Sequence, residues 1–250
     1  MRKLIHTAII FTGVLLLMVS GVHAQKGFVP EKKLTTESNT LNNKLAGKQY
    51  YNMVVPSGSV FLFNDWKDGY VKLINGDRYD DLSLKYNIFY DELIEINNRS
   101  VSMIMLDKNT ISEFGFYNEQ NGETMVFTKM YFPKNPDGDY FFNPLYDGNL
   151  KLVVRNRSLE EETNIYKDAY GIMRNTVFNI HKYYYLIFPD NHFERFNLKR
   201  RSFLDLFSGD KETKKEIRRI LRRNQIFFQS DEETIQAVKL VEEKFYSNSN

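Results

Sequence analysis

Residues 70–87, YVKLINGDRYDDLSLKYN, contain the strongest fold signal in the chain. In the first half, Val71 and Leu73 occupy every second position, and apolar residues alternate again in the second half. Such alternation gives a strand one face toward a core and one toward water. Between the halves stands Asn75-Gly76, and both residues tolerate the positive φ angles of a type I′ turn. The stretch therefore predicts a β-hairpin.

Similar strand patterns continue on both sides of this hairpin. Turn residues recur at spacings of roughly eight to twelve, which is typical of antiparallel sandwiches and barrels. Val101 to Leu106 is apolar on both faces and predicts a central, doubly covered strand. Met125 to Phe132 and Tyr140 to Tyr146 flank a turn with Pro and Gly. Residues 49–198 are therefore predicted to form an antiparallel β domain, a sandwich or an open barrel.

One polar stretch interrupts this rhythm. Asn156 to Asn175, which contains Glu160-Glu161-Glu162, has no alternation of apolar residues and is interpreted as a long loop or a short helix. Strands are predicted to resume at Val177 to Ile180 and at Tyr183 to Phe188.

The apolar spacing becomes helical from about Ser202, which could cap a first short helix. Ser208 or Asp210 could cap a second helix running to about Asn224. Ser230, followed three residues later by Glu233, forms a capping box that opens a third helix. Residues 199–250 are thus a helical C-terminal element, and the fold class is α+β, a mainly antiparallel β-meander followed by helices.

The N-terminus has the pattern of an export signal. Arg2 and Lys3 precede an apolar run, and small residues before Ala24 match a signal-peptidase site that would leave Gln25 first. An uncleaved anchor helix is the alternative, because the run approaches the length needed to span a bilayer. Residues 1–24 are interpreted as a signal peptide and residues 25–48 as a flexible segment. We expect an exported protein, periplasmic or secreted, with no transmembrane span in the mature chain.

Composition excludes several classes of function. Once Arg2 and Lys3 leave with the signal peptide, the 34 basic residues fall to 32, which equals the number of acidic residues. A uniformly basic nucleic-acid-binding protein is therefore excluded. The sequence has no cysteine, which rules out disulfides, thiol nucleophiles and thiolate metal sites.

Few residues suggest catalysis or metal binding. His181 and His192 are the histidines outside the leader, and they are interpreted as strand-edge and turn residues. Asp65 to Gly69 and Asp137 to Asp139 only superficially resemble calcium loops, because neither has the spaced ligand pattern that ends in Glu. Glu160 to Glu162 has no identifiable partner acid or base. We expect no cofactor, no metal and no catalytic set.

A basic helix face is the main candidate site. Lys211, Lys215, Arg218 and Arg222 recur at spacings of four and three, which places them on one face of the second predicted helix. The face could bind an anion, such as an acidic polysaccharide, a lipid head group or a partner protein. Alternatively, it is a solvated surface whose charge complements the helix dipole and the acidic third helix. Nucleic acid is disfavoured because no aromatic residue interleaves the basic ones.

Two aromatic features can each be interpreted either as part of a binding site or as ordinary packing. Trp66 lies at a predicted loop tip, where it could stack on a sugar ring or fold over the edge of the domain. Tyr183-Tyr184-Tyr185 must point to alternate faces of a strand, so core packing with one hydroxyl near water explains it without a binding site.

Several segments resemble uncharacterised exported proteins of the Bacteroidota, a group of Gram-negative bacteria. They are residues 86–93 (YNIFYDEL), residues 142–148 (FNPLYDG) with residues 150–152, and the helical segment 214–225. The resemblance covers most of residues 59–245. It implies bacterial export and supplies no activity, substrate or catalytic residue.

These observations favour a non-enzymatic exported protein that binds or structurally supports a partner, either a protein or an anionic polymer at the cell envelope. One alternative is a hydrolase that uses carboxylates alone, as glycosidases do. Another is a small-ligand carrier with a cavity in the β domain.

Overall fold

The computed structural model describes residues 45–51, 55, 57–97, 102–118, 120, 122–131, 139–168 and 171–246. The predicted signal peptide, its cleavage site at Ala24 and Gln25, and most of segment 25–48 lie outside the described residues. Across the part of the chain that is described, no helix has the length and apolar character needed to cross a membrane.

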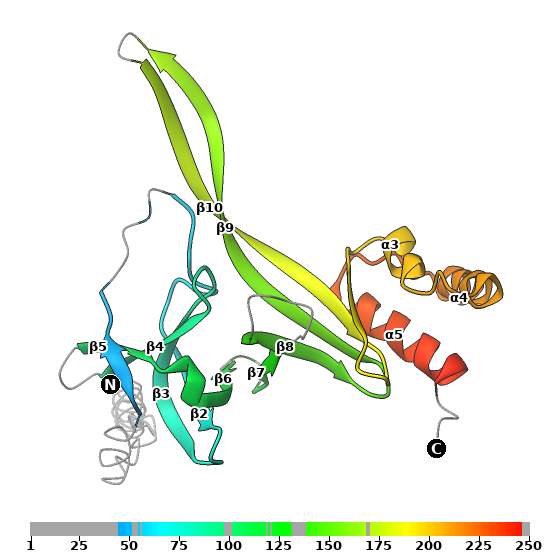
Figure 1. The fold of residues 1–250 in the computed structure, drawn as a ribbon, viewed down its shortest axis with the longest axis horizontal. Coiled ribbons are helices and arrows are strands. Elements are labelled where there is room, and N and C mark those ends of the chain that lie inside the picture. Colours follow the sequence, from blue (N-terminus) through cyan, green and yellow to red (C-terminus); the bar gives the residue numbers. More distant parts are fainter. Residues whose placement is uncertain are drawn as a thin grey trace, which may run out of the picture. The chain divides into compact units, whose positions relative to one another are not determined.

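Within the described residues, eleven strands form one open sheet in which every pair of neighbours is antiparallel (Figure 1). The order across the sheet is β1-β5-β4-β3-β2-β6-β7-β8-β9-β10-β11. The predicted antiparallel α+β fold is confirmed. The strands are β1 (Gly47–Gln49), β2 (Lys67–Leu73), β3 (Arg78–Asn87), β4 (Glu92–Asn97), β5 (Ser102–Leu106), β6 (Ile111–Tyr117), β7 (Thr124–Tyr131), β8 (Asp139–Asp147), β9 (Lys151–Asp168), β10 (Gly171–Ile187) and β11 (Phe193–Phe196).

The predicted hairpin at Asn75-Gly76 is the β2–β3 connection, but its turn is not type I′, because Asn75 has no positive φ and the turn spans Leu73 to Gly76 with Ile74 and Asn75 at its centre. Gly76 has a φ of 92°, and its amide donates to the carbonyl of Leu73 at 3.1 Å. The Asn75 side chain accepts from the Asp77 amide at 3.1 Å, which reinforces the turn. Glycine is needed here because an L side chain rarely adopts this positive φ.

The alternating residues of these strands form a sheet core on one face of β2 to β8. Tyr86 lies among aromatic rings at its centre, 5.1 Å from the Phe114 centroid and 5.2 Å from that of Phe127. Edge-to-face geometry of this kind adds to the energy of simple burial. The buried members of the sheet core are Leu45, Val71, Tyr79, Leu82, Leu84, Tyr86, Ile88, Leu93, Leu106, Ile111, Phe114, Phe116, Phe127 and Phe141.

The interpretation of 156–175 as a loop or helix is wrong. This stretch belongs to the β9–β10 hairpin, in which the two strands pair from Ile187 with Lys151 to Gly171 with Asp168. The two strands predicted after residue 176 are likewise one strand, β10. Beyond Val154, β9 and β10 have only each other as ladder partners among the described strands. Backbone pairing holds such a ribbon, so its sequence needs no alternation of apolar residues.

The predicted central position of 101–106 is also wrong. Val101 lies outside the described residues, and β5 is next to the edge of the sheet, with only the three-residue β1 beyond it. Its first four residues are only half-buried. An apolar run therefore indicated a strand correctly, but run length alone does not determine the position of a strand in a sheet.

Three helices follow the sheet in the described residues: α3 (Arg200–Asp205), α4 (Lys211–Arg223) and α5 (Asp231–Phe245). Asp210 caps α4 by accepting from the Glu212 amide, and Ser230 caps α5 by accepting from the Glu233 amide, as predicted. Ser202 is not a cap. It lies inside α3, and its hydroxyl accepts instead from the Asn197 amide at 3.0 Å.

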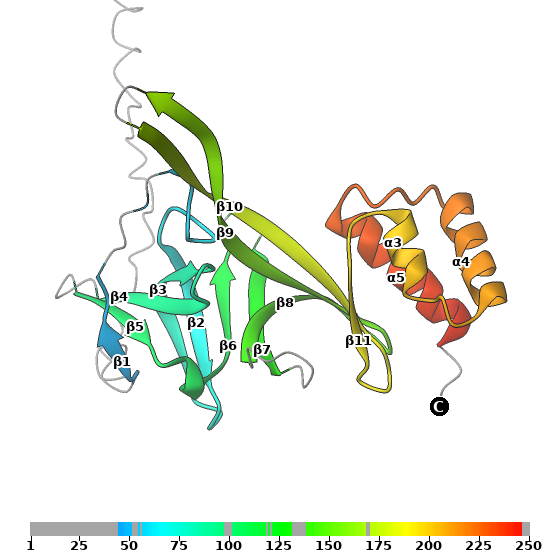
Figure 2. The ribbon, with the colours of Figure 1, turned by 45° about the horizontal axis from the view of Figure 1, so that its top comes forward.

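These helices pack on β9, β10 and β11 and form a second core, the helical core (Figure 2). Glu242 of α5 docks the helix by accepting from the Leu150 amide at 2.8 Å and from the Tyr146 hydroxyl at 3.1 Å. The buried members of the helical core are Leu150, Leu152, Val154, Tyr184, Leu186, Phe196, Phe203, Leu204, Phe207, Ile217, Leu221, Ile226, Phe228, Ala237, Val238 and Val241.

Candidate functional site

Helix α4 has one buried face and one charged face. Ile217 and Leu221 are fully buried in the helical core, and they lie four residues apart, one turn along the helix. The opposite face is therefore turned to solvent, and it carries the basic residues. Their outward position follows from burial of the two apolar anchors.

Three of the four predicted anion-binding residues, Lys215, Arg218 and Arg222, line one surface cavity, and Lys211 does not. Arg218 and Arg222 are exposed and line the same two surface cavities. Lys215 faces Glu212 at 3.8 Å, an exposed pair of little energetic value, and Lys211 lines neither cavity. The structure thus brings Arg218 and Arg222 together and leaves Lys211 apart.

The first of these cavities, of about 400 Å³, lies between α3 and α4, and we call it the arginine groove. Lys214 pairs with Asp205 across it at 2.7 Å, and this hydrogen bond holds the pKa of Asp205 below its ordinary value. Four arginines remain in excess over the paired charges. The groove is lined by Arg200, Arg201, Leu204, Asp205, Lys214, Arg218 and Arg222.

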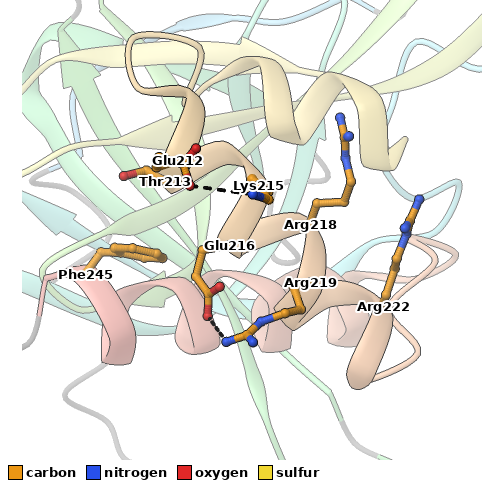
Figure 3. Close-up of a pocket in the computed structure, with 8 residues that line it drawn as sticks. All are labelled: Glu212, Thr213, Lys215, Glu216, Arg218, Arg219, Arg222 and Phe245. Carbon is orange, nitrogen blue, oxygen red and sulfur yellow. Dashed lines mark hydrogen bonds and ion pairs between the residues drawn. The ribbon is translucent and has the colours of Figure 1, made fainter.

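The second cavity, of about 750 Å³, adjoins the other side of Arg218 and Arg222 and reaches Phe245 of α5 (Figure 3). Glu216 pairs there with Arg219 at 2.6 Å. With Glu212 and Glu216 in its lining, this cavity is less positive than the arginine groove. The unpaired positive charge on α4 is therefore greater on the side of the arginine groove.

The acidic start of α5 does not neutralise these arginines. Asp231 accepts from Lys182 and from the Tyr184 hydroxyl, and Glu233 accepts from backbone amides at Phe227 and Gln229. Within the described residues, neither Arg218 nor Arg222 has an acidic partner. Asp231 and Glu233 are thus engaged away from α4, while the alternative interpretation of a solvated face that complements the helix dipole stays open.

Two arginines of the groove were missing from the predicted face. Arg200 and Arg201 belong to α3, which sequence spacing cannot place beside α4. Arg200 is held in position, because its Nη2 donates to the Ile226 carbonyl and its guanidinium lies 5.4 Å from the Phe227 ring centroid. The run of basic residues at 199–201 was the available signal.

Ionisable groups also cluster at the β3–β4 turn. Asp91 accepts from the buried Tyr86 hydroxyl and forms an ion pair with Lys108 at 2.5 Å. Burial raises the pKa of Tyr86 well above its ordinary value, and the charge of Asp91 and its hydrogen bond act in the same direction. Arg155 is buried nearby, with its guanidinium 3.2 Å from the Tyr140 ring centroid. Asp91 and Lys108 are thus paired with each other, as in a structural network, whereas Arg155 stacks on an aromatic ring and its buried Nε–H has no hydrogen-bond partner among the described residues.

Trp66 does lie at the surface, in a wall of an open cavity. This aromatic cavity, of about 670 Å³, lies at the end of the sheet core. Phe63 and Trp66 come from the segment before β2, while Phe116 and Met125 come from the core face of β6 and β7. Its lining comprises Phe63, Trp66, Lys67, Asp68, Phe116, Tyr117, Asn118, Gln120, Glu123, Thr124, Met125 and Asn143.

A carboxylate hydrolase needs two carboxylates that face each other. Burial raises the pKa of Glu92 and of Glu95, both on β4. They are three residues apart on one strand and therefore point to opposite faces of the sheet. Neither lines the arginine groove, the second cavity or the aromatic cavity. The two carboxylates with raised pKa values thus cannot act as a pair across a cleft.

The remaining candidates have local partners. His181 Nε2 lies 2.7 Å from Glu161, and His192 Nε2 lies 3.1 Å from Glu194. Most of the segment 137–139 is outside the described residues, and across the residues that are described no group of three potential metal-ligating side chains occurs. Of the tyrosine triplet, Tyr184 is buried and donates to Asp231 at 2.7 Å.

Comparison with known proteins found no matching family model, no matching curated protein and no matching solved structure.

Proposed function

We propose that this chain is an exported, non-enzymatic binding protein whose arginine groove takes an extended anion, such as an acidic polysaccharide of the cell envelope. Export rests on the N-terminal sequence pattern. The observation that carries the binding proposal is the position of Arg218 and Arg222, which line two adjoining cavities without an acidic partner in the described chain.

Arginine suits this ligand for chemical reasons. Its planar guanidinium donates two parallel hydrogen bonds to a carboxylate or a sulfate, which gives both strength and orientation. Arg201 on α3 and the pair on α4 approach the same groove from two helices. The positions of the helices are set by a buried core, so the arginines are held near each other before a ligand arrives.

An extended ligand fits better than a single small anion. Arg218 and Arg222 are shared between both cavities, so the positive surface continues past the arginine groove along α4. A polymer with a charge on each repeat can occupy several arginines at once. Each added contact then acts at the high effective concentration that the first contact creates.

Reversal of both shared charges tests the proposal. We expect Arg218→Glu combined with Arg222→Glu to weaken binding of heparin and of polygalacturonate by roughly 10–100-fold at low salt, because charge-assisted hydrogen bonds are replaced by repulsion. Wild-type binding should also weaken as salt is added. Isothermal titration calorimetry on the purified protein measures both effects.

The matched control makes the same change of charge on α5. Lys239→Glu combined with Lys244→Glu alters two exposed residues outside both cavities and should leave the affinity within about twofold of wild type, since distant exposed charges are screened. Equal losses in the two double variants would show that only net charge matters, and the proposed groove would be wrong.

A further inference from the structure

A second surface feature, independent of the helices, is the aromatic cavity at the end of the sheet core. Its floor continues the apolar face of the sheet, because Phe116 on β6 and Met125 on β7 are directly paired neighbours. Phe116 is 3% exposed, whereas Met125 is 41% exposed, so the cavity begins where the core ends. Small-molecule sites are typically concave and largely apolar, with a few polar groups that fix the ligand's orientation.

Aromatic rings line one side of this cavity. Phe63 packs edge-to-face on Phe116 with their centroids 5.4 Å apart, which fixes Phe63 at the border of the core. The Lys85 ammonium lies over the Trp66 ring, 5.6 Å from its centroid. Trp66 is half-buried in this position, so part of its apolar surface stays in contact with water. Such a ring offers a flat apolar surface for a ligand to cover.

Polar groups of low net charge complete the lining. Three amide side chains contribute, from Asn118, Gln120 and Asn143, and amides both donate and accept hydrogen bonds. Asn143 is oriented by its own hydrogen bond, in which Nδ2 donates to the Val126 carbonyl at 2.8 Å. Lys67 is outnumbered by Asp68 and Glu123, so the cavity has one net negative charge.

These properties select among ligand classes. An anion gains no net attraction here, in contrast to the arginine groove. A fully apolar ligand would strip water from the amides and return no hydrogen bond. An uncharged ring with one apolar face and several hydroxyl groups satisfies both the aromatic side and the amide side. We propose that the aromatic cavity binds a neutral saccharide, with a sugar ring stacked on Trp66.

The chain contains a single tryptophan, so selectively excited emission reports on this cavity alone. We expect a saturable change in Trp66 emission on titration with at least one of cellohexaose, laminarihexaose and maltohexaose. Calorimetry then compares variants. Trp66→Ala should weaken binding about tenfold, and Trp66→Phe should retain most of the affinity because it keeps an aromatic face.

A charge placed in the cavity tests the location without removing a packed side chain. Met125→Glu should weaken saccharide binding at least about tenfold, because the new carboxylate would be desolvated beneath the sugar. The matched control is Ile74→Glu, which changes an exposed apolar residue, 65% exposed, at the β2–β3 turn. This variant should bind as wild type does and shows that the domain tolerates such a substitution.

These variants distinguish failure of the saccharide proposal from failure of the proposed anion-binding function. The Arg218→Glu and Arg222→Glu double variant should bind neutral oligosaccharides with unchanged affinity, and Met125→Glu should bind heparin unchanged. The saccharide proposal is overturned if none of the three oligosaccharides produces a heat or an emission change. It is also overturned if Met125→Glu and Ile74→Glu bind saccharide equally, or if the cavity binds only an uncharged apolar probe such as Nile red.

Discussion

Replacing Asp91 with alanine is expected to lower the free energy of unfolding by up to about 3–5 kcal/mol, the range for removal of one partner of a buried ion pair, since the Asp91 side chain is buried and that of Lys108 is 29% exposed. Asp91 is 4% exposed and serves two groups, the Tyr86 hydroxyl and the Lys108 ammonium. Tyr86 is 1% exposed and is the ring around which the sheet core packs, so its hydroxyl would be left without its partner in the interior. Urea denaturation, followed by circular dichroism, measures the change.

A second aspartate offers a control for backbone conformation. Asp91 has a φ of 62°, and the exposed Asp81 has a φ of 56°, so alanine is strained at both positions. Asp81→Ala should cost only about 1–2 kcal/mol, the cost of the left-handed backbone alone. Asp91→Asn keeps the backbone preference and an acceptor for Tyr86, and should fall between the two. A loss no larger in Asp91→Ala than in Asp81→Ala would contradict a stabilising role for the buried network.

Phe203→Ala should destabilise the protein by a similar amount, about 3–5 kcal/mol, through the cavity that a removed phenyl ring leaves in a close-packed core. Phe203 is fully buried, and its ring contacts Phe196 at 5.5 Å, Phe207 at 5.5 Å and Phe228 at 5.0 Å between centroids. Together with Leu204, it is the buried residue by which α3 packs into the helical core. Loss of the helical signal in urea, followed by circular dichroism, measures the effect.

The comparison for this variant is Phe227→Ala. Phe227 is 57% exposed, so its truncation should change stability by less than about 1 kcal/mol. Because α3 carries Arg200 and Arg201, Phe203→Ala should also weaken heparin binding, while the aromatic cavity keeps its affinity. Similar stabilities for the two phenylalanine variants would mean that α3 is not anchored through Phe203.

Local sequence patterns predicted the strands and helices that bury one face in a core and expose the other to water. The β2–β3 hairpin and the caps of α4 and α5 were identified because alternation, a turn dipeptide and a capping residue each act over a few positions. The β9–β10 hairpin was missed for the opposite reason. Residues 160–162 are exposed or half-buried, and they are held in a strand by backbone pairing and by polar contacts of Glu161 with Asn179 and His181 across the ribbon, which leave no apolar alternation in the sequence.

The sequence predicted only those residues of the candidate site that lie on a single helix. Helical spacing placed Arg218 and Arg222 on one face, since residues four apart lie above each other. The contribution of α3 depends on packing between helices, which spacing does not encode. The aromatic cavity shows the same limit. Trp66 was marked as a loop aromatic, but Phe116 and Met125 resemble ordinary core residues until the pairing of β6 with β7 places them at its end.

An NMR titration that follows the arginine side-chain Nε–H resonances tests the binding proposal most directly. The resonances are assigned by single Arg→Lys substitutions, and heparin is added to the purified protein at low salt. The largest shifts should occur at Arg201, Arg218 and Arg222, while Arg78 on β3 and the buried Arg155 should not move. Shifts that are largest outside α3 and α4, or no shift at any arginine, would contradict an anion-binding groove between these helices.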